Sequence, residues 1–360
     1  GNGVNGRDIP HNLGVAPGMI IYKPLSAIGG DGSGDAWWVD HRSLNAYKSL
    51  RLNSTVGEQS NYVYWTTRFD ADNLNVSGNV NHNGINYVAY LFAHNNGDGE
   101  FGPDQDQDII KCGSYTGAGS TDVDVNLGFE PQWIMIKKSS ADGDQWLMLD
   151  SMRGTVTGGG DSRLFANLTN TEYGTNDYLE FTSTGFRITG TSGEVATNGA
   201  TYIYMAIRRG PLAAPTDATK VFFVDSGTAA NNVLSTGFNP DMSIVGRTTG
   251  GSKYVGARLT GSSAYLFTDS TAAEASYPGW TWDESNQFKQ GMYNANNVSW
   301  TWKRAPSYFD VVAYSGTGSA RTVSHNLGVV PEMMWVKKRS SGDDWFVYVG
   351  SLGNTNKLEL

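Results

Sequence analysis

A short motif that recurs four times is the feature that most constrains the fold of this 360-residue chain. Each copy has a Gly turn, an apolar residue, one further residue, a Pro, another residue and then an apolar strand. The motif prolines are Pro17, Pro131, Pro240 and Pro331, which lie 114, 109 and 91 residues apart. Solenoid repeats have shorter periods, so this spacing predicts tandem copies of a domain that each hold their own core.

The similarity between the copies extends beyond the proline. A Gly-x-Gly turn precedes three of the motifs, and an aromatic strand closes each complete copy. We therefore divide the chain into module 1 (1–112), module 2 (113–218), module 3 (219–307) and module 4 (308–360). Module 3 is the most diverged, and module 4 is the start of a truncated copy. We expect the chain to be a middle portion of a longer polypeptide.

Composition and patterning indicate an all-β protein. The chain contains 45 Gly, 18 Tyr, 14 Phe and 11 Trp, and only 17% of its residues are charged. This mixture favours short strands joined by many turns. Several strands alternate in side-chain character, as Val298 to Trp302 do, which is typical of a sheet with one buried face. Modules of this length and pattern predict tandem antiparallel β-sandwiches.

Charge and cysteine content exclude several classes of protein. The net charge is −9, whereas nucleic-acid binding needs Lys and Arg clustered on one face, so we expect no nucleic-acid partner. No apolar run approaches the roughly 20 residues of a membrane helix, so we expect no membrane insertion. Cys112 is the single cysteine, which excludes an internal disulfide and predicts a buried strand residue.

An acidic loop at the end of module 1 is the best candidate for a metal site. Asp104, Asp106 and Asp108 alternate along it and could direct oxygen ligands toward Ca²⁺. The pattern of an EF-hand fails, because Ile109 stands where Gly is needed and Tyr115 where Glu is needed. A solvated loop between two modules is the alternative. Apart from this Ca²⁺ hypothesis, we expect no cofactor.

Two pairs of tryptophans are candidates for ligand binding. Trp37, Trp38, Trp280 and Trp282 could form flat platforms on which a sugar ring stacks. The alternative is that each indole packs in a core, as large aromatic residues commonly do. Adjacent residues of a regular strand point to opposite faces, so Trp37 and Trp38 should not share one core.

The sequence contains no pattern that identifies a catalytic site. Glycosidases need two carboxylates at a set separation, and nothing here selects a pair from the many Asp residues. The five histidines show no His-x-x-x-His spacing, and neither a Gly-x-Ser-x-Gly turn nor a phosphate-binding loop occurs. We therefore expect a protein that is not an enzyme and name no catalytic residue.

The second copy of the motif carries a resemblance to a known group of proteins. Residues 127–138 (LGFEPQWIMIKK) are followed by Trp146, by 150–154 (DSMRG) and by 181–188 (FTSTGFRI). These residues resemble the repeat domain of tail-fibre and other virion proteins of tailed bacteriophages, especially phages of marine cyanobacteria. The resemblance implies a β-sandwich of jelly-roll or concanavalin-like type in a virion appendage. It implies no catalytic residues.

These observations together predict a structural and attachment role in a virion appendage, outside the host cell. Self-association into a fibre, as a homotrimer, is expected by analogy with such appendages. Other virion proteins and a glycan of the host surface are the expected partners. Two alternatives remain: a glycan-degrading enzyme of the tailspike type, and a spacer or decoration protein without a ligand.

Overall fold

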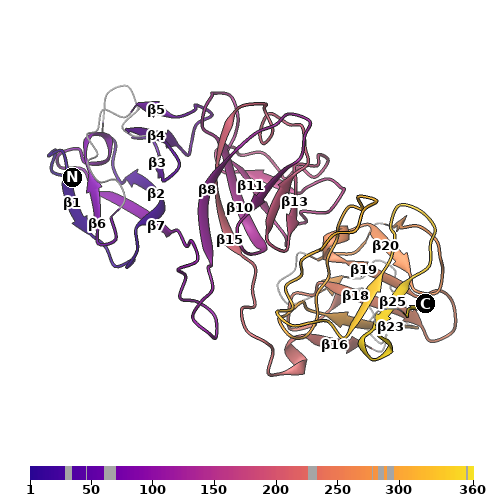
Figure 1. Cartoon of the computed structure of the whole chain (residues 1–360). Coiled ribbons are helices and arrows are strands. Elements are labelled where there is room, and N and C mark those ends of the chain that lie inside the picture. The colour runs from indigo at the N-terminus through magenta and orange to yellow at the C-terminus, as the bar shows by residue number, and fades with distance from the viewer. Residues whose placement is uncertain are drawn as a thin grey trace. The chain divides into compact units, whose positions relative to one another are not determined.

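The computed structural model describes residues 1–28, 35–45, 47–60, 70–225, 233–277, 279–282, 288–289, 296–353 and 356–360 (Figure 1). Within these ranges the regular structure consists of antiparallel strands and a few single-turn 3₁₀ helices, which confirms the all-β prediction. None of the helices in these ranges is long and apolar enough to cross a membrane.

Module 1 is built from a five-stranded and a two-stranded sheet. The larger sheet has the order β5-β4-β3-β2-β7, and β1 pairs with β6 in the smaller one. The elements are β1 (Arg7–Pro10), β2 (Pro17–Pro24), β3 (Trp38–His41), β4 (Lys48–Arg51), β5 (Gln59–Ser60), β6 (Asn73–Val76), η2 (Gly78–Val80) and β7 (Tyr87–Ala93).

Module 2 repeats this plan with a five-stranded sheet of order β12-β11-β10-β15-β8 and a three-stranded sheet of order β13-β14-β9. Its strands are β8 (Ile110–Thr116), β9 (Val123–Asn126), β10 (Pro131–Lys138), β11 (Leu147–Asp150), β12 (Arg163–Phe165), β13 (Leu179–Thr182), β14 (Gly185–Ile188) and β15 (Thr201–Arg208). Strand β8 crosses the predicted module border at residue 112, so the structural border lies before Ile110.

Module 3 has a six-stranded sheet of order β16-β23-β18-β19-β20-β21 and a two-stranded sheet of β17 and β22. Its elements are η3 (Ala218–Lys220), β16 (Phe222–Asp225), β17 (Val233–Leu234), β18 (Met242–Arg247), β19 (Tyr254–Ala257), η4 (Arg258–Thr260), β20 (Ala264–Phe267), β21 (Ala275–Ser276), β22 (Phe288–Lys289) and β23 (Asn297–Trp302). Module 4 contributes one sheet of β24 (Met333–Val336), β25 (Phe346–Val349) and β26 (Leu358–Glu359), with η5 (Gly350–Leu352) between the last two strands.

The chain forms two compact units, each of which contains a pair of modules. Unit 1 comprises residues 1–150, 162–179 and 185–209, and unit 2 comprises residues 151–161, 180–184 and 210–360. Modules 1 and 2 therefore lie mainly in unit 1, and modules 3 and 4 lie in unit 2.

The strand that begins with the motif proline is buried on both faces in module 1. Ile20 and Tyr22 of β2 pack with Trp38 of β3 against Leu74 and Val76 of β6, and this cluster is the core between the two sheets of the module. The β2 residues between them point to the opposite face of the sheet. Met19 and Ile21 on that second face are also buried. In an isolated sandwich the outer face of a sheet would be exposed to solvent, so another part of the chain must cover it.

Candidate module interface and aromatic surfaces

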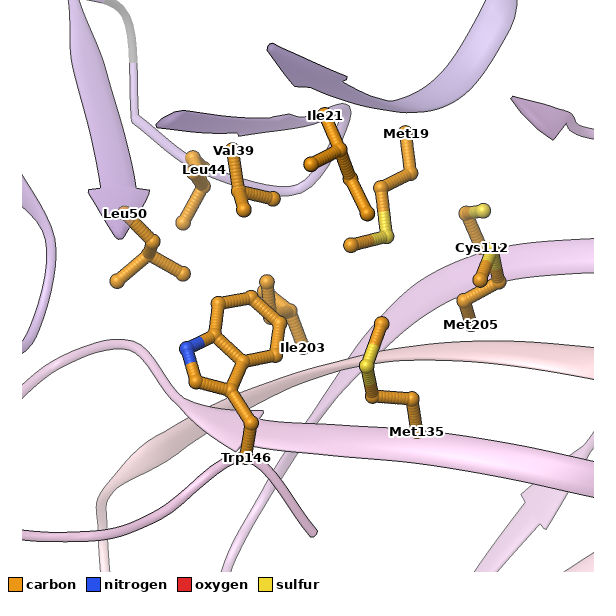
Figure 2. Packing of buried hydrophobic residues seen from close by; sticks show 10 residues of the cluster. All are labelled: Met19, Ile21, Val39, Leu44, Leu50, Cys112, Met135, Trp146, Ile203 and Met205. Carbon is orange, nitrogen blue, oxygen red and sulfur yellow. The ribbon is translucent and has the colours of Figure 1, made fainter. Parts of the chain in front are cut away.

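The second face of the module 1 sheet packs against the sheet of module 2. Met19, Ile21, Val39, Leu44 and Leu50 of module 1 form one hydrophobic cluster with Cys112, Met135, Trp146, Ile203 and Met205 of module 2. Figure 2 shows the Trp146 ring projecting from the module 2 side toward the aliphatic side chains of module 1. Each module thus has its own core, and in addition the two modules share one. Module 1 holds its own core, as predicted, and the cluster shared with module 2 is a second core that the sequence analysis did not predict.

Directional polar contacts fix the register of the two modules. Trp146 Nε1 donates a hydrogen bond to the carbonyl oxygen of Arg51 at 2.9 Å. Lys137 Nζ donates to the carbonyl oxygen of Thr55 at 2.9 Å and to that of Asp144 at 2.6 Å. We call the contacts of Trp146 and Lys137 with Arg51 and Thr55 the clasp. It joins a Trp and a Lys of the second module to two carbonyls of the first.

Further bonds extend the clasp along both sides of the interface. Glu58 N donates to the carbonyl oxygen of Ser139 at 2.7 Å. On the other side, the buried ring of His41 lies 3.0 Å from the carbonyl oxygen of Tyr204, measured from Nε2. The interface therefore combines an apolar centre with backbone hydrogen bonds at its border.

The same clasp occurs between modules 3 and 4. Trp345 Nε1 donates to the carbonyl oxygen of Phe267 at 2.7 Å, and Lys337 Nζ donates to that of Thr271 at 3.2 Å. Lys337 follows Pro331 by the same six residues that separate Lys137 from Pro131. The bond from Glu58 to Ser139 also has a counterpart, because Glu274 N donates to the carbonyl oxygen of Arg339 at 2.9 Å. The module pair, rather than the single module, is thus the recurring structural unit.

Burial shifts the pKa of three groups of module 2. Desolvation lowers the pKa of Lys137 from its ordinary value of 10.5 to about 8, although the Asp144 carboxylate opposes the shift. Desolvation raises the pKa of the Cys112 thiol to about 12 and that of the Tyr204 hydroxyl to about 12. Cys112 is therefore a packing residue held in its neutral form, as its place in an apolar strand predicts.

The two pairs differ at the point where the first module leads into the second. Gly18 of module 1 lies so close to Cys112 and His94 that a Cβ added there would come within 2.8 Å of the Cys112 Sγ and 2.7 Å of the His94 Cβ. The backbone N–H of Cys112 donates to His94 Nδ1 at 3.1 Å. The junction of the first pair therefore consists of a glycine, Gly18, in close contact with the side chains of Cys112 and His94.

Charged groups occupy the corresponding place in the second pair. Asp241, which follows its motif proline as Gly18 does, pairs with Arg258 at 3.4 Å and accepts the backbone N–H of Arg304 at 2.7 Å. The Arg304 Nε lies 2.6 Å from Asp310 Oδ1, and both side chains are about 95% buried. Asp310 also accepts the backbone N–H of Asn326 in module 4 at 2.7 Å. A buried ion-pair network thus links modules 3 and 4.

Three of the four candidate tryptophans lie in cores. Trp38 is buried in the core of module 1, and Trp280 and Trp282 stack on each other in the core of module 3, with ring centroids 5.6 Å apart. Trp37 is half-buried. Its ring stacks on Tyr90 at 6.4 Å, and Lys23 Nζ lies 5.7 Å from its centroid. As expected, Trp37 and Trp38 do not share one core. The accessible aromatic surface of this set is the Trp37–Tyr90 stack.

The acidic candidates for a metal site lie in the loop before β8. Asp104 and Asp106 are exposed, whereas the Asp108 carboxylate accepts the backbone N–H groups of Gly97 at 2.8 Å and Gly99 at 2.9 Å. Within the described ranges, no group of three or more His, Cys, Asp or Glu side chains is placed to hold a metal ion. The Asp108 side chain braces the loop, and the Ca²⁺ hypothesis stays a prediction.

One cluster in module 2 was not selected from the sequence. Arg163 of β12 lies over the rings of Phe165, Tyr173 and Tyr178, at 5.5, 5.3 and 4.5 Å from their centroids. The only sequence signal is an Arg two residues from a Phe on the same side of a strand, followed by a polar loop that contains two Tyr. Such a signal is weak, because only the fold brings the loop back onto the strand.

The fold and these interfaces define a tandem array of antiparallel β-sandwich modules that associate in pairs. The chain belongs to the family described as domain of unknown function (DUF7483), whose model matches residues 1–211 and residues 215–360. The division between the two matched stretches lies close to the border of modules 2 and 3, so each stretch contains one module pair. No curated protein and no solved structure matches the chain.

Proposed function

We propose that this chain is a structural and attachment segment of a bacteriophage virion appendage, built from module pairs in series. The observation that carries the proposal is the clasp, which recurs with matching residues in both pairs. In the first pair an apolar interface accompanies the clasp. Relative motion of domains is the default unless their interface is large and apolar, and an extended protein needs such interfaces to hold its length. The resemblance of residues 127–188 of module 2 to tail-fibre repeats supports the location.

Contact with a host-surface glycan is part of this proposal. The Trp37–Tyr90 stack supports it, because Tyr90 is 46% exposed and its ring stacks on the Trp37 indole at a centroid distance of 6.4 Å. Flat aromatic faces with a polar edge suit the apolar face of a sugar ring. Self-association as a homotrimer is proposed by analogy with other fibres.

Labelling of intact virions with antibodies against the chain tests the location. We expect label on an appendage in electron micrographs, and label confined to lysed cells, absent from particles, would contradict the proposal. Light scattering on the purified full chain tests the trimer. A mass three times the 38.9 kDa of one chain is expected, and a stable monomer would contradict self-association.

Glycan-array binding separates attachment from a spacer role. We expect the full chain to bind host-derived glycans and the Tyr90→Ala variant to bind them less. If the folded chain binds none of these glycans, a spacer role without a ligand is favoured. Release of reducing ends from host polysaccharide would instead favour the enzyme alternative.

A further inference from the structure

The Arg163 cluster of module 2 combines a cation with three aromatic rings at the border of a sandwich. Arg163 pairs with Leu149 across the β11–β12 ladder, and Leu149 is fully buried, so both side chains lie on the inner face of the sheet. Strand β12 is the edge of that sheet. The guanidinium therefore lies where the gap between the two sheets opens to solvent.

No acidic side chain among the described residues forms an ion pair with Arg163. Its Nε and Nη1 are buried and have no hydrogen-bond partner among the described residues, which leaves Nη2 as the nitrogen that reaches solvent. Buried charged groups are normally paired, and an unpaired guanidinium costs free energy. Contacts with ring faces compensate for part of that cost. An anion that reached Nη2 would supply the missing partner.

The surroundings of the guanidinium offer the contacts that a sugar ring needs. Tyr173 is 42% exposed, and two backbone hydrogen bonds, of 2.8 and 3.2 Å, hold it beside Arg163. The side-chain amides of Asn170 and Asn176 are exposed and donate to the Tyr173 and Tyr178 hydroxyls at 3.2 and 3.4 Å. A ring face, two amides and one open cation thus converge at one sheet edge.

We propose that this cluster binds a carboxylate-bearing sugar residue, with Arg163 contacting the carboxylate and Tyr173 stacking on the ring. The proposal deepens the attachment role, because it names an acidic saccharide as a ligand class and places its site in module 2, apart from the Trp37–Tyr90 stack of module 1. A protein of net charge −9 gains no general attraction for acidic polymers, so recognition would depend on this local cation.

The test measures binding of oligosaccharides to the full chain by calorimetry. The probes are an oligo-uronate, a neutral oligosaccharide of equal length and a sulfated one. We expect the oligo-uronate to bind most tightly and to weaken with added salt, and Arg163→Met to reduce its affinity at least tenfold. Equal binding of the neutral probe would overturn the role of the charge, and tighter binding of the sulfated probe would overturn the carboxylate preference.

Matched variants separate the site from general effects. Arg187→Met removes an exposed arginine of the same module that is paired with Asp124 at 2.7 Å, and should leave uronate affinity unchanged. Tyr173→Ala removes an exposed ring and should weaken binding without unfolding, which keeps the proposal testable if Arg163→Met fails to fold.

A third variant should increase the affinity for the oligo-uronate. The Glu194 carboxylate accepts a hydrogen bond from the Tyr178 hydroxyl and would repel the carboxylate of the ligand, so Glu194→Gln should strengthen uronate binding. Unchanged affinity in both Arg163→Met and Tyr173→Ala would overturn the site. Virion labelling would be unaffected by that result, so the two proposals fail independently.

Discussion

The two module pairs share a clasp but differ in how completely their apolar faces are covered. In the first pair, Met19, Val39 and Leu50 are almost fully buried against module 2. Their counterparts in module 3, counted from the motif proline and along the ladders, are Met242, Val255 and Leu266, of which the first two are only half-buried. The clasp therefore forms in both pairs beside apolar residues that are buried to different extents.

This comparison indicates that the polar and apolar parts of the interface are separable. Hydrogen bonds from Trp and Lys set the register in both pairs, while the burial of the apolar side chains beside them differs. Stability should then differ between the pairs even though their geometry is alike. Three substitutions and one change of pH test this difference between the two pairs.

The largest effect is expected from truncation of the clasp tryptophan. Trp146→Ala empties a fully buried ring site and leaves the Arg51 carbonyl without its donor, which should lower the free energy of unfolding of unit 1 by about 3–5 kcal/mol. Hydrogen exchange by mass spectrometry should show faster exchange across modules 1 and 2. Trp345→Ala is the matched control and should cost less, since its neighbour Trp335 is 45% exposed. Equal costs would contradict the difference between the pairs.

A smaller loss is expected when the charged junction of the second pair is broken. Arg304→Met leaves Asp310 buried without its partner and should destabilise unit 2 by about 3 kcal/mol. The double variant Arg304→Met with Asp310→Leu should recover much of that loss, because no uncompensated charge remains. Urea unfolding of both variants measures the difference. If the double variant is no more stable than the single one, the junction depends on more than this pair.

A single added methyl group probes the neutral junction of the first pair. Gly18→Ala places a Cβ against Cys112 and His94 and should cost about 1–3 kcal/mol through overpacking. Gly316→Ala adds the same methyl where no atom lies within 4 Å and should leave stability nearly unchanged. Thermal unfolding compares the two. Rescue of Gly18→Ala by Cys112→Ala would localise the clash, and a melting temperature equal to the wild type would show that the junction has room.

The pH dependence of unit 1 provides the smallest and most specific test. The folded state binds fewer protons than the unfolded state between pH 8 and 10.5 because the pKa of Lys137 is lowered, so stability should rise there. Above pH 9 the raised pKa of Cys112, and above pH 10 that of Tyr204, reverse the sign because the folded state retains protons. Urea midpoints should therefore rise from pH 8 to 9 and fall beyond 10. Cys112→Ala should reduce the fall, and an identical alkaline profile would contradict the assignment.

The all-β class was predictable because it depends on local signals. Pro17 and Pro131 are the first residues of β2 and β10, and Pro240 and Pro331 lie two residues before β18 and β24. Side-chain alternation marks strands such as β23. The core shared by modules 1 and 2 was also indicated by the sequence, but the pattern has two interpretations. The uninterrupted apolar run from Met19 to Tyr22 is typical of a strand buried on both faces, but alternation elsewhere suggested one buried face.

The candidate sites were less predictable than the fold. The sequence around a strand tryptophan does not show whether its ring is buried in a core or exposed to solvent. Trp38 and Trp282 could therefore not be distinguished from Trp37 by sequence. The Arg163 cluster depends on contacts between β12 and a loop that returns to it, and no spacing rule encodes that return. Whether such a side chain lies in a core or in an accessible site depends on contacts between residues far apart in the sequence, and the residue type alone does not show it.

The shared core of modules 1 and 2 has a consequence for how such genes change length. Removal of one module of a pair would expose the apolar face formed by residues such as Met135 and Leu50, whereas removal of a whole pair would expose neither. Recombination between repeats should therefore be tolerated mainly when it inserts or deletes two modules together. Populations of these genes should differ in even numbers of modules.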